Sequence, residues 1–218
     1  MKAIIFDLDG TLVDSVPDLH LAANMLLEAH HCKGLEQAQV RSFVGNGIPV
    51  LVEKICKAAG LPFDDSNKEA IIADYLSFYD QELEGKNTQP FAGVRACLEA
   101  FRAKGIHMGL CTNKPEAPTR IILKDLGFDA LFATVIGGDS LPQRKPSPEP
   151  LWKSFEGFDL NDCLFVGDSE VDAATAHAAG VSCALYAQGY RQTPLSELPH
   201  DFSFSDFAEL LAYVEAKL

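Results

Sequence analysis

Positively charged residues are scarce in this sequence of 218 residues. Lys and Arg together number 18 against 31 Asp and Glu, which gives a formal net charge of −13 at pH 7. Nucleic acids and anionic membrane surfaces are bound mainly through clusters of Lys and Arg that neutralise phosphates. The charge balance therefore argues against nucleic acid and membranes as partners, and it leaves both a monomer and a homodimer open.

Long apolar runs are also missing. The first run, residues 3–6, ends at Asp7 and is too short for the core of a signal peptide, and no later run is long and uncharged enough to span a bilayer. We therefore expect a cytoplasmic protein. The cysteines form no Cys-x-x-Cys pair and no zinc-like spacing, so we expect reduced and mostly buried thiols.

Short apolar runs rich in β-branched residues alternate with longer segments of helical periodicity. This alternation predicts an α/β fold with a Rossmann-like, doubly wound parallel sheet as its core. A helix is expected over residues 94–104, where apolar residues recur at helical spacing and Gly105 follows. Strands are expected at Ala3–Phe6, His107–Cys111, Ala133–Ile136, Cys163–Val166 and Cys183–Tyr186, with an edge strand at Phe202–Phe204 before a last helix, Asp206–Lys217.

The interval from about Pro17 to Gly85 breaks this rhythm, because helical segments follow one another there without a strand. We interpret it as a helical cap inserted after the first strand, with the polar, turn-forming residues 85–90 as its closing hinge. The predicted core domain comprises residues 1–15 and 88–218, and the predicted cap comprises residues 16–87. The cap helices are expected at Asp18–His30, Gln37–Phe43, Pro49–Ala59 and Lys68–Leu83.

Two carboxylates, Asp7 and Asp9, follow directly after the first predicted strand. In extended backbone, residues two apart point to the same side, and the carboxyl ends of parallel strands face the binding crevice. Two carboxylates held close together repel each other unless a cation or a proton sits between them. Taken alone, the pair is equally compatible with ordinary turn-forming aspartates at a strand end.

Three other strand ends carry complementary groups, which favours a binding site over a simple turn. Thr112 and Asn113 follow the second strand and offer a hydroxyl and an amide. Lys145 precedes alternating prolines, which stiffen its segment. Asp168 and Asp172 follow the fourth strand four residues apart, which places both on one face if a helix begins there.

These motifs together resemble those of the haloacid dehalogenase superfamily. The likeness covers nearly the whole chain and rests on Asp7-x-Asp9-Gly10-Thr11, Thr112, Lys145 and Gly167-Asp168-x-x-x-Asp172. It implies a phosphatase in which Asp7 attacks phosphorus and forms an aspartyl-phosphate, while Asp9 acts as general acid and then as general base. The other residues implied to hold the phosphate or the substrate are Thr112, Lys145, Thr11 and Asn113.

The same resemblance implies a magnesium ion held by Asp7, the backbone carbonyl of Asp9 and Asp168, with Asp172 in support. Charge favours such a cation. The formal charges of four carboxylates, a phosphate monoester and Lys145 sum to about −5. Mg²⁺ reduces this negative charge to about −3, and a proton on Asp9 reduces it further to about −2. Hard oxygen ligands also suit Mg²⁺ better than zinc.

Within the predicted cap, residues 41–47 (Arg-Ser-Phe-Val-Gly-Asn-Gly) are similar to a cap segment of bacterial phosphoglycolate phosphatases. That likeness implies that Arg41 and the loop of Gly45, Asn46 and Gly47 meet the far end of a small anionic phosphoester, 2-phosphoglycolate above all. A guanidinium or the amides of a glycine loop would suit its carboxylate. The loop is equally compatible with a plain turn between cap helices, with Arg41 a solvated charge.

Other functions stay open at this point. Asp9 favours phosphoryl over carbon–halogen chemistry, but sugar phosphates, nucleotides and pyrophosphate remain alternative substrates. An Asp, Thr and Lys set on a parallel sheet also fits a phospho-accepting signalling module. Such modules carry the acceptor Asp after a later strand and have no helical insertion after the first, so the order of the motifs argues against this alternative.

Overall fold

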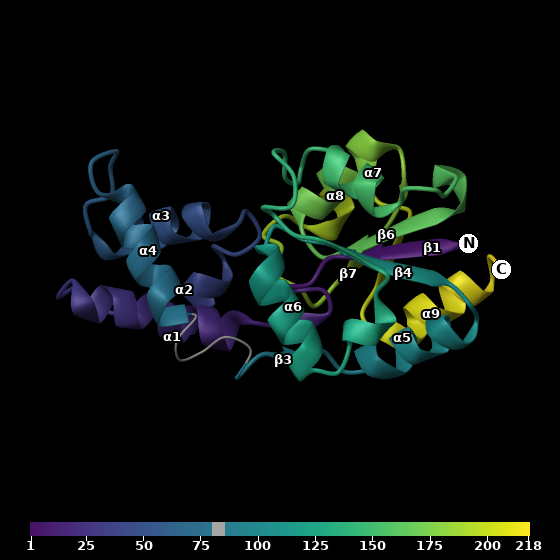
Figure 1. Ribbon diagram of the computed structural model, residues 1–218, viewed down its shortest axis with the longest axis horizontal. Coiled ribbons are helices and arrows are strands. Elements are labelled where there is room, and N and C mark those ends of the chain that lie inside the picture. Colours follow the sequence, from purple (N-terminus) through teal and green to yellow (C-terminus); the bar gives the residue numbers. More distant parts are fainter. Residues whose placement is uncertain (80–85) are drawn as a thin grey trace.

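The computed structural model describes residues 1–79 and 86–218 and contains a six-stranded sheet with the order β5-β4-β1-β6-β7-β8 (Figure 1). Every neighbouring pair of strands in this sheet is parallel. The predicted α/β class is confirmed, and the predicted strands match to within one residue at either end. The strands are β1 (Ala3–Phe6), β4 (His107–Cys111), β5 (Thr134–Ile136), β6 (Cys163–Gly167), β7 (Ser182–Tyr186) and β8 (Phe202–Phe204).

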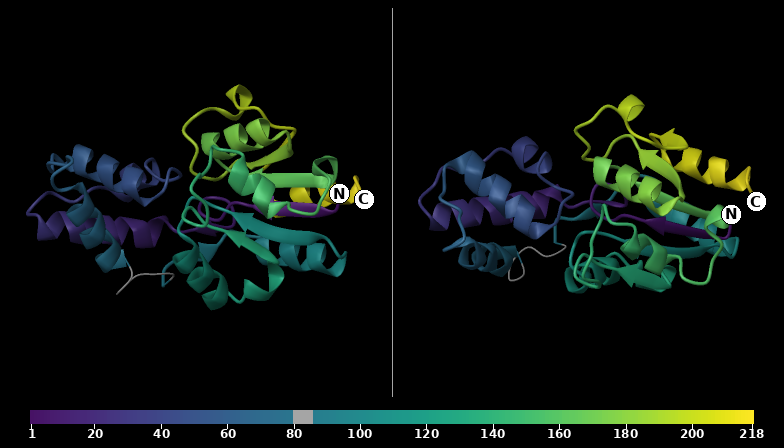
Figure 2. Two further views of the ribbon diagram at one scale, coloured as in Figure 1. Left: turned by 45° about the horizontal axis from the view of Figure 1, so that its top comes forward. Right: turned by 90° about the horizontal axis from the view of Figure 1, so that it is seen from above.

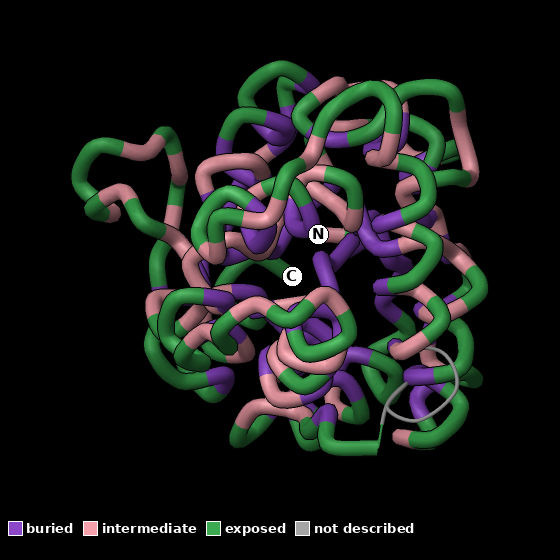
Figure 3. Tube along the Cα trace, turned by 90° about the vertical axis from the view of Figure 1, so that its left-hand side faces the viewer, coloured by how far each residue is buried: buried purple, intermediate pink, exposed green. Residues whose placement is uncertain are grey.

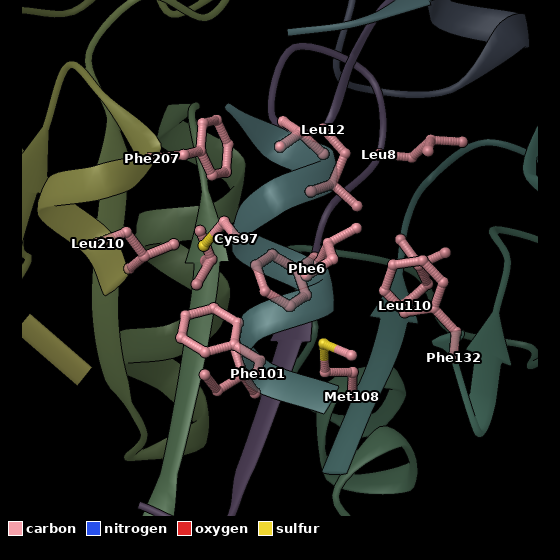
Figure 4. Close-up of a cluster of buried hydrophobic side chains, with 14 of the residues drawn as sticks. Phe6, Leu8, Leu12, Cys97, Phe101, Met108, Leu110, Phe132, Phe207 and Leu210 are labelled. Atoms are coloured by element: carbon pink, nitrogen blue, oxygen red, sulfur yellow. The ribbon is translucent and has the colours of Figure 1, made fainter. Parts of the chain in front are cut away.

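Strand β1 is fully buried at the centre of the sheet, and its side chains alternate between two cores. Ile4 and Phe6 belong to a large apolar cluster, whereas Ala3 and Ile5 belong to a second one. A near-continuous apolar strand is what a parallel sheet covered on both faces requires. Figure 4 shows Phe6 inside the first cluster, where its ring centroid lies 6.4 Å from that of Phe101.

Helices cover both faces of this sheet, with the bounds α5 (Val94–Ala103), α6 (Glu116–Asp125), α7 (Glu149–Ser154), α8 (Glu170–Ala179) and α9 (Phe207–Glu215). Helices α5, α6 and α9 contribute to the cluster around Phe6, and α7 and α8 to the cluster around Ile5, so the core is doubly wound as predicted. None of the helices that the structure describes has the length and apolar character needed to cross a membrane.

A helical cap follows β1, as predicted, and consists of α1 (Val16–Ala29), α2 (Gln37–Arg41), α3 (Ile48–Ala59) and α4 (Lys68–Phe78). These helices enclose an apolar core of their own, in which Leu26, Val52 and Tyr75 are fully buried. The cap lies beyond the end of the sheet toward which β1 runs (Figure 1, Figure 2), and buried positions run along the inside of the chain trace (Figure 3). The last part of the helix predicted to reach Leu83 lies outside the described residues.

A short antiparallel pair links the two crossings between core and cap. Strand β2 (Val13–Asp14) pairs with β3 (Gln89–Pro90). From the sequence, residues 85–90 are expected to be turn-forming only, because a two-residue strand carries no periodic pattern. The described part of that segment, from residue 86, therefore contains a strand in addition to turns. The exact domain boundaries at residues 15/16 and 87/88 stay a prediction.

Candidate active site

The acidic residues predicted at the strand ends lie at the junction of sheet and cap. The backbone N–H of Asp7 donates to the Val166 carbonyl (2.9 Å) and so extends the pairing of β1 with β6 by one residue. Asp7, Asp9, Thr112 and Asn113 line a pocket together with residues of the cap. The cap side of this pocket is formed by Leu19, Val44, Gly45, Gly47, Ile48 and Leu51.

Asp7, Asp168 and Asp172 form a cluster of buried carboxylates. One carboxylate oxygen from each lies within 4.8 Å of the other two. Burial raises the pKa of Asp7 to about 7, with Asp172 and Asp9 adding to the rise and Lys145 opposing it. The pKa of Asp168 is raised well above its usual value. Burial is the largest cause, and the negative charges of Asp172 and Asp7 come next. The protein thus concentrates negative charge that its own residues only partly offset.

Asp168 is held from several sides. The Thr11 hydroxyl donates to its Oδ1 (2.9 Å), and the backbone N–H of Tyr190 donates to its Oδ2 (2.6 Å). Two glycines permit this close approach, because a Cβ atom on Gly10 or Gly189 would lie 2.6 or 2.3 Å from Asp168 Oδ2. The carboxylate therefore has one orientation, fixed by backbone and hydroxyl donors.

Lys145 bridges two of the three carboxylates. Its Nζ lies 3.0 Å from Asp7 Oδ1 and 2.7 Å from Asp172 Oδ1. Burial opposes the charge on Lys145, but the attraction of Asp172 and Asp7 outweighs burial and raises its pKa. The other oxygen of Asp172 accepts from the N–H and the hydroxyl of Ser169 and from the N–H of Asp168. The Asp172 N–H donates in turn to the Ser169 hydroxyl oxygen, which completes a capping box at the start of α8. One fixed positive charge therefore stands inside the acidic cluster.

The donor set of this cluster fits a hard divalent cation. It consists of buried carboxylate oxygens from Asp7, Asp168 and Asp172, which are ligands that such cations prefer. The nearby Asp9 Oδ1 is buried and has no hydrogen-bond partner within the described part of the chain. Like charges brought this close are stabilised by a cation between them, so the group is suited to a metal.

Asn113 joins the core to the cap, and Thr112 lies beside it at the end of β4. The Asn113 amide donates to the carbonyls of Gly45 and Lys145, both at 3.0 Å, and the Thr112 hydroxyl accepts from the N–H of Lys114 (3.3 Å). Gly45 and Gly47 contribute to the pocket wall, and contact of this loop with substrate stays a prediction. The structure thus brings the predicted strand-end residues and the glycine loop of the cap together.

Arg41 and Asn46 are not among the residues that line this pocket as the structure describes it. The Arg41 guanidinium donates to the carbonyls of Gln188 (2.9 Å) and Gly189 (3.0 Å), and it lies 4.8 Å from the ring centroid of Tyr190. Arg41, at the end of α2, therefore connects the cap to the loop that holds Asp168. Direct contact of Arg41 or Asn46 with substrate stays a prediction.

Comparison with known proteins identifies the family. Residues 4–186 match the model of the haloacid dehalogenase-like hydrolases. The chain belongs to this family. A phosphoglycolate phosphatase of Cereibacter sphaeroides (strain ATCC 17029 / ATH 2.4.9) is 43% identical over 210 residues, which cover 96% of each chain. One from Rhodobacter capsulatus is 43% identical over 213 residues, covering 98% of this chain and 96% of its own.

A solved structure agrees with these relatives in fold. The crystal structure described as a predicted phosphoglycolate phosphatase from Haemophilus somnus 129pt has a TM-score of 0.91, is 34% identical and covers 98% of each chain. The predicted membership of the haloacid dehalogenase superfamily is confirmed. The matched region runs from β1 to the end of β7 and includes the whole carboxylate cluster of this HAD-like hydrolase.

Three residues of this HAD-like hydrolase site were not predicted from the sequence. Lys114 lines the pocket, Tyr79 contacts Lys114 from the cap, and Tyr190 supports Asp168. A lysine directly after Thr112 and Asn113 was a signal available in the sequence, because it belongs to the same strand end. The two tyrosines gave no such signal, since their roles depend on contacts between distant segments.

Proposed function

We propose that this protein catalyses the Mg²⁺-dependent hydrolysis of a small phosphomonoester, 2-phosphoglycolate, to glycolate and phosphate through an aspartyl-phosphate. The observation that carries the proposal is the meeting of Asp7, Asp9 and Lys145 with a buried carboxylate cluster beside one pocket. The relatives named phosphoglycolate phosphatases support the choice of substrate.

In the proposed first step, a carboxylate oxygen of Asp7 forms a bond to phosphorus while the bond from phosphorus to the glycolate oxygen breaks. Asp9 gives its proton to that oxygen as it leaves. In the second step, a water molecule attacks the phosphorus of the aspartyl-phosphate and gives a proton to Asp9. Phosphate leaves, and the Asp7 carboxylate and the protonated Asp9 are restored.

Asp7 can act as a nucleophile only when it is ionised. Burial works against ionisation, whereas Lys145, 3.0 Å away, favours it. In the proposal, Lys145 and the Thr112 hydroxyl hold phosphoryl oxygens, with Thr11 and Asn113 supporting the same end of the substrate. Asp7, the Asp9 carbonyl and Asp168 would hold the magnesium ion, with Asp172 in support. When bound, Mg²⁺ supplies positive charge that offsets the carboxylates and the phosphate.

The reaction and its substrate can be tested by measuring released phosphate from 2-phosphoglycolate, a sugar phosphate, a nucleotide, pyrophosphate and an aryl phosphate, with and without Mg²⁺. We expect 2-phosphoglycolate to rank first and activity to need the metal. Asp9→Asn should reduce kcat by about 10²- to 10⁴-fold without loss of folding. Asp125→Asn, at an exposed position on α6, is the matched control.

The proposal has two separate ways to fail. An Asp9→Asn variant that releases phosphate at the normal rate would exclude the acid–base role. A ranking in which 2-phosphoglycolate is no better than an aryl phosphate would exclude the substrate while leaving a general phosphatase.

A further inference from the structure

Lys114 is a buried cation that the proposed mechanism does not use. Its side chain is 2% exposed, and its Nζ lies 2.9 Å from the Tyr79 hydroxyl and 3.6 Å from Asp9 Oδ2. Tyr79 belongs to the cap, directly after α4, whereas Lys114 follows β4 of the core. The ammonium group therefore stands where the two parts of the molecule meet, beside the residue assigned to protonate the leaving oxygen.

Three other cations of the described chain lie close to the site. Arg144 lines a neighbouring pocket, and a Cβ atom on Gly47 would lie 3.3 Å from its Nη1. Lys145 is occupied between Asp7 and Asp172, and the Arg41 guanidinium points to the carbonyls of residues 188 and 189. Among the pocket-lining residues that the structure describes, Lys114 is the one with a positively charged side chain. The cap side of the pocket is largely apolar, which leaves Lys114 as the lining cation beside Asp9.

The chemistry of the substrate places its carboxylate near Asp9. In 2-phosphoglycolate, a single methylene carbon separates the ester oxygen that leaves from the carboxylate. A group that binds this carboxylate must therefore lie close to the acid that protonates the ester oxygen. The Nζ of Lys114 meets this requirement, since 3.6 Å separates it from Asp9 Oδ2.

We propose that Lys114 binds the substrate carboxylate and thereby selects phosphate esters of short 2-hydroxy acids, with Tyr79 as a positioning residue for its ammonium group. This inference rests on the proposed function. Tyr79 is itself fixed, because its ring stacks on Tyr75 with centroids 6.4 Å apart. Since Tyr79 comes from the cap, the carboxylate site is complete only when cap and core are together.

A site that places a buried charge next to the substrate favours ligands that carry the matching group over analogues that lack it. Ethyl phosphate has the same number of carbon atoms as 2-phosphoglycolate and no carboxylate. We therefore compare kcat/KM for these two substrates in the wild-type protein and in Lys114→Met, Lys114→Arg and Tyr79→Phe. Lys124→Met, at an exposed position on α6, is the matched control.

We expect Lys114→Met to lower kcat/KM for 2-phosphoglycolate by about 10- to 100-fold, which corresponds to the loss of a charge-assisted hydrogen bond. The same variant should lower the value for ethyl phosphate by a clearly smaller factor, because only its effect on Asp9 applies to that substrate, so that the preference falls. Lys114→Arg should restore part of the preference. Tyr79→Phe keeps the ring but removes the hydroxyl, and it should raise KM for 2-phosphoglycolate about 3- to 10-fold with little effect on kcat.

An equal loss for both substrates in Lys114→Met would overturn the inference, since it would mean that Lys114 serves Asp9 or the packing of the cap. If Lys114→Met does not fold, Tyr79→Phe carries the test: an unchanged ratio between the two substrates overturns the inference. A wild-type protein that does not prefer 2-phosphoglycolate over ethyl phosphate would instead refute the proposed function itself.

Discussion

Gly10 forms the turn that follows the Asp7 and Asp9 pair, and two properties make glycine necessary there. Its backbone φ is +85°, a region that other residues rarely adopt. A Cβ atom at this position would also lie 2.6 Å from Asp168 Oδ2 and 2.8 Å from the ring of Tyr190. The turn therefore brings the backbone directly against the carboxylate proposed to hold the metal.

The effect of that contact can be separated from backbone strain. Gly60 has a φ of +73° at the end of α3, but a Cβ there would meet no atom within 4 Å. Gly60→Ala should cost about 1 kcal/mol from strain alone. Gly10→Ala should cost about 2–4 kcal/mol, because overpacking adds to the strain.

Gly10→Ala should also raise the Mg²⁺ concentration for half-maximal activity by about tenfold or more, since Asp168 is displaced. Thermal unfolding and Mg²⁺ titrations of activity measure the two effects. A normal Mg²⁺ requirement in Gly10→Ala would contradict a metal role for Asp168.

The residues that could be predicted from the sequence are those whose position follows from a strand end. Asp7, Thr112 and Asp168 each come directly after a buried strand, and parallel strands end at the same edge of a sheet. Tyr79 and Tyr190 could not be found in this way, because each acts through a partner more than twenty residues away in sequence. Contacts of that kind depend on how the cap and the loop after β7 pack against the core.

At the scale of elements, the two chain crossings between cap and core are tied together by a buried carboxylate. Asp18, in the first turn of α1, is fully buried. It accepts hydrogen bonds from the backbone and side-chain nitrogens of Asn87 and from the Thr88 hydroxyl (2.8 Å). The segment entering the cap is thus joined to the segment leaving it, next to the β2–β3 pair.

Asp18→Ala should destabilise the protein by about 2–4 kcal/mol, because the buried Thr88 hydroxyl and the partly buried nitrogens of Asn87 lose their acceptor at once. Asp74→Ala, in the exposed pair between Asp74 and His30, should change stability by about 0.5 kcal/mol or less. Denaturant midpoints of the two variants make the comparison. Equal midpoints would show that the crossing is not held by Asp18.

The elements that were predicted correctly are those with a clear periodic pattern. Strand β4 and helix α5 follow their apolar residues closely, and both match the expected ranges to within a residue. Helix α1 begins at Val16 rather than at the expected Asp18, because Pro17 is well suited to the first turn of a helix. Strands β2 and β3 were missed, since their pairing is decided by the two crossings rather than by residue type.

At the scale of the whole molecule, a net charge of −13 opposes the approach of an anionic substrate. Attraction must therefore be local, from Lys145, from Lys114 and from a bound cation. The carboxylate cluster contributes to the acidic excess, and its repulsion is greatest when no cation is present. The stability of the metal-free protein should therefore depend on pH in a direction set by Asp7.

Asp7 has a pKa of about 7 in the folded protein against 3.8 for an ordinary aspartate. A raised folded-state pKa means that the stability contributed by the proton on Asp7 is complete below about pH 4, declines as pH rises, and is gone above about pH 7. Metal-free protein should therefore unfold more easily at pH 8 than at pH 5, by up to about 3 kcal/mol. Mg²⁺ should restore the stability lost at pH 8 and have less effect at pH 5, where protons compete for the same oxygens.

Asp7→Asn removes one titrating carboxyl, so the stability of the metal-free variant should vary less with pH. Thermal unfolding of the wild-type protein and of the variant, with and without a chelator, measures this difference. Two outcomes would mean that Asp7 is ionised without help from a cation. One is a metal-free wild-type protein that becomes more stable between pH 5 and pH 8. The other is an Asp7→Asn variant whose stability depends on pH as that of the wild-type protein does.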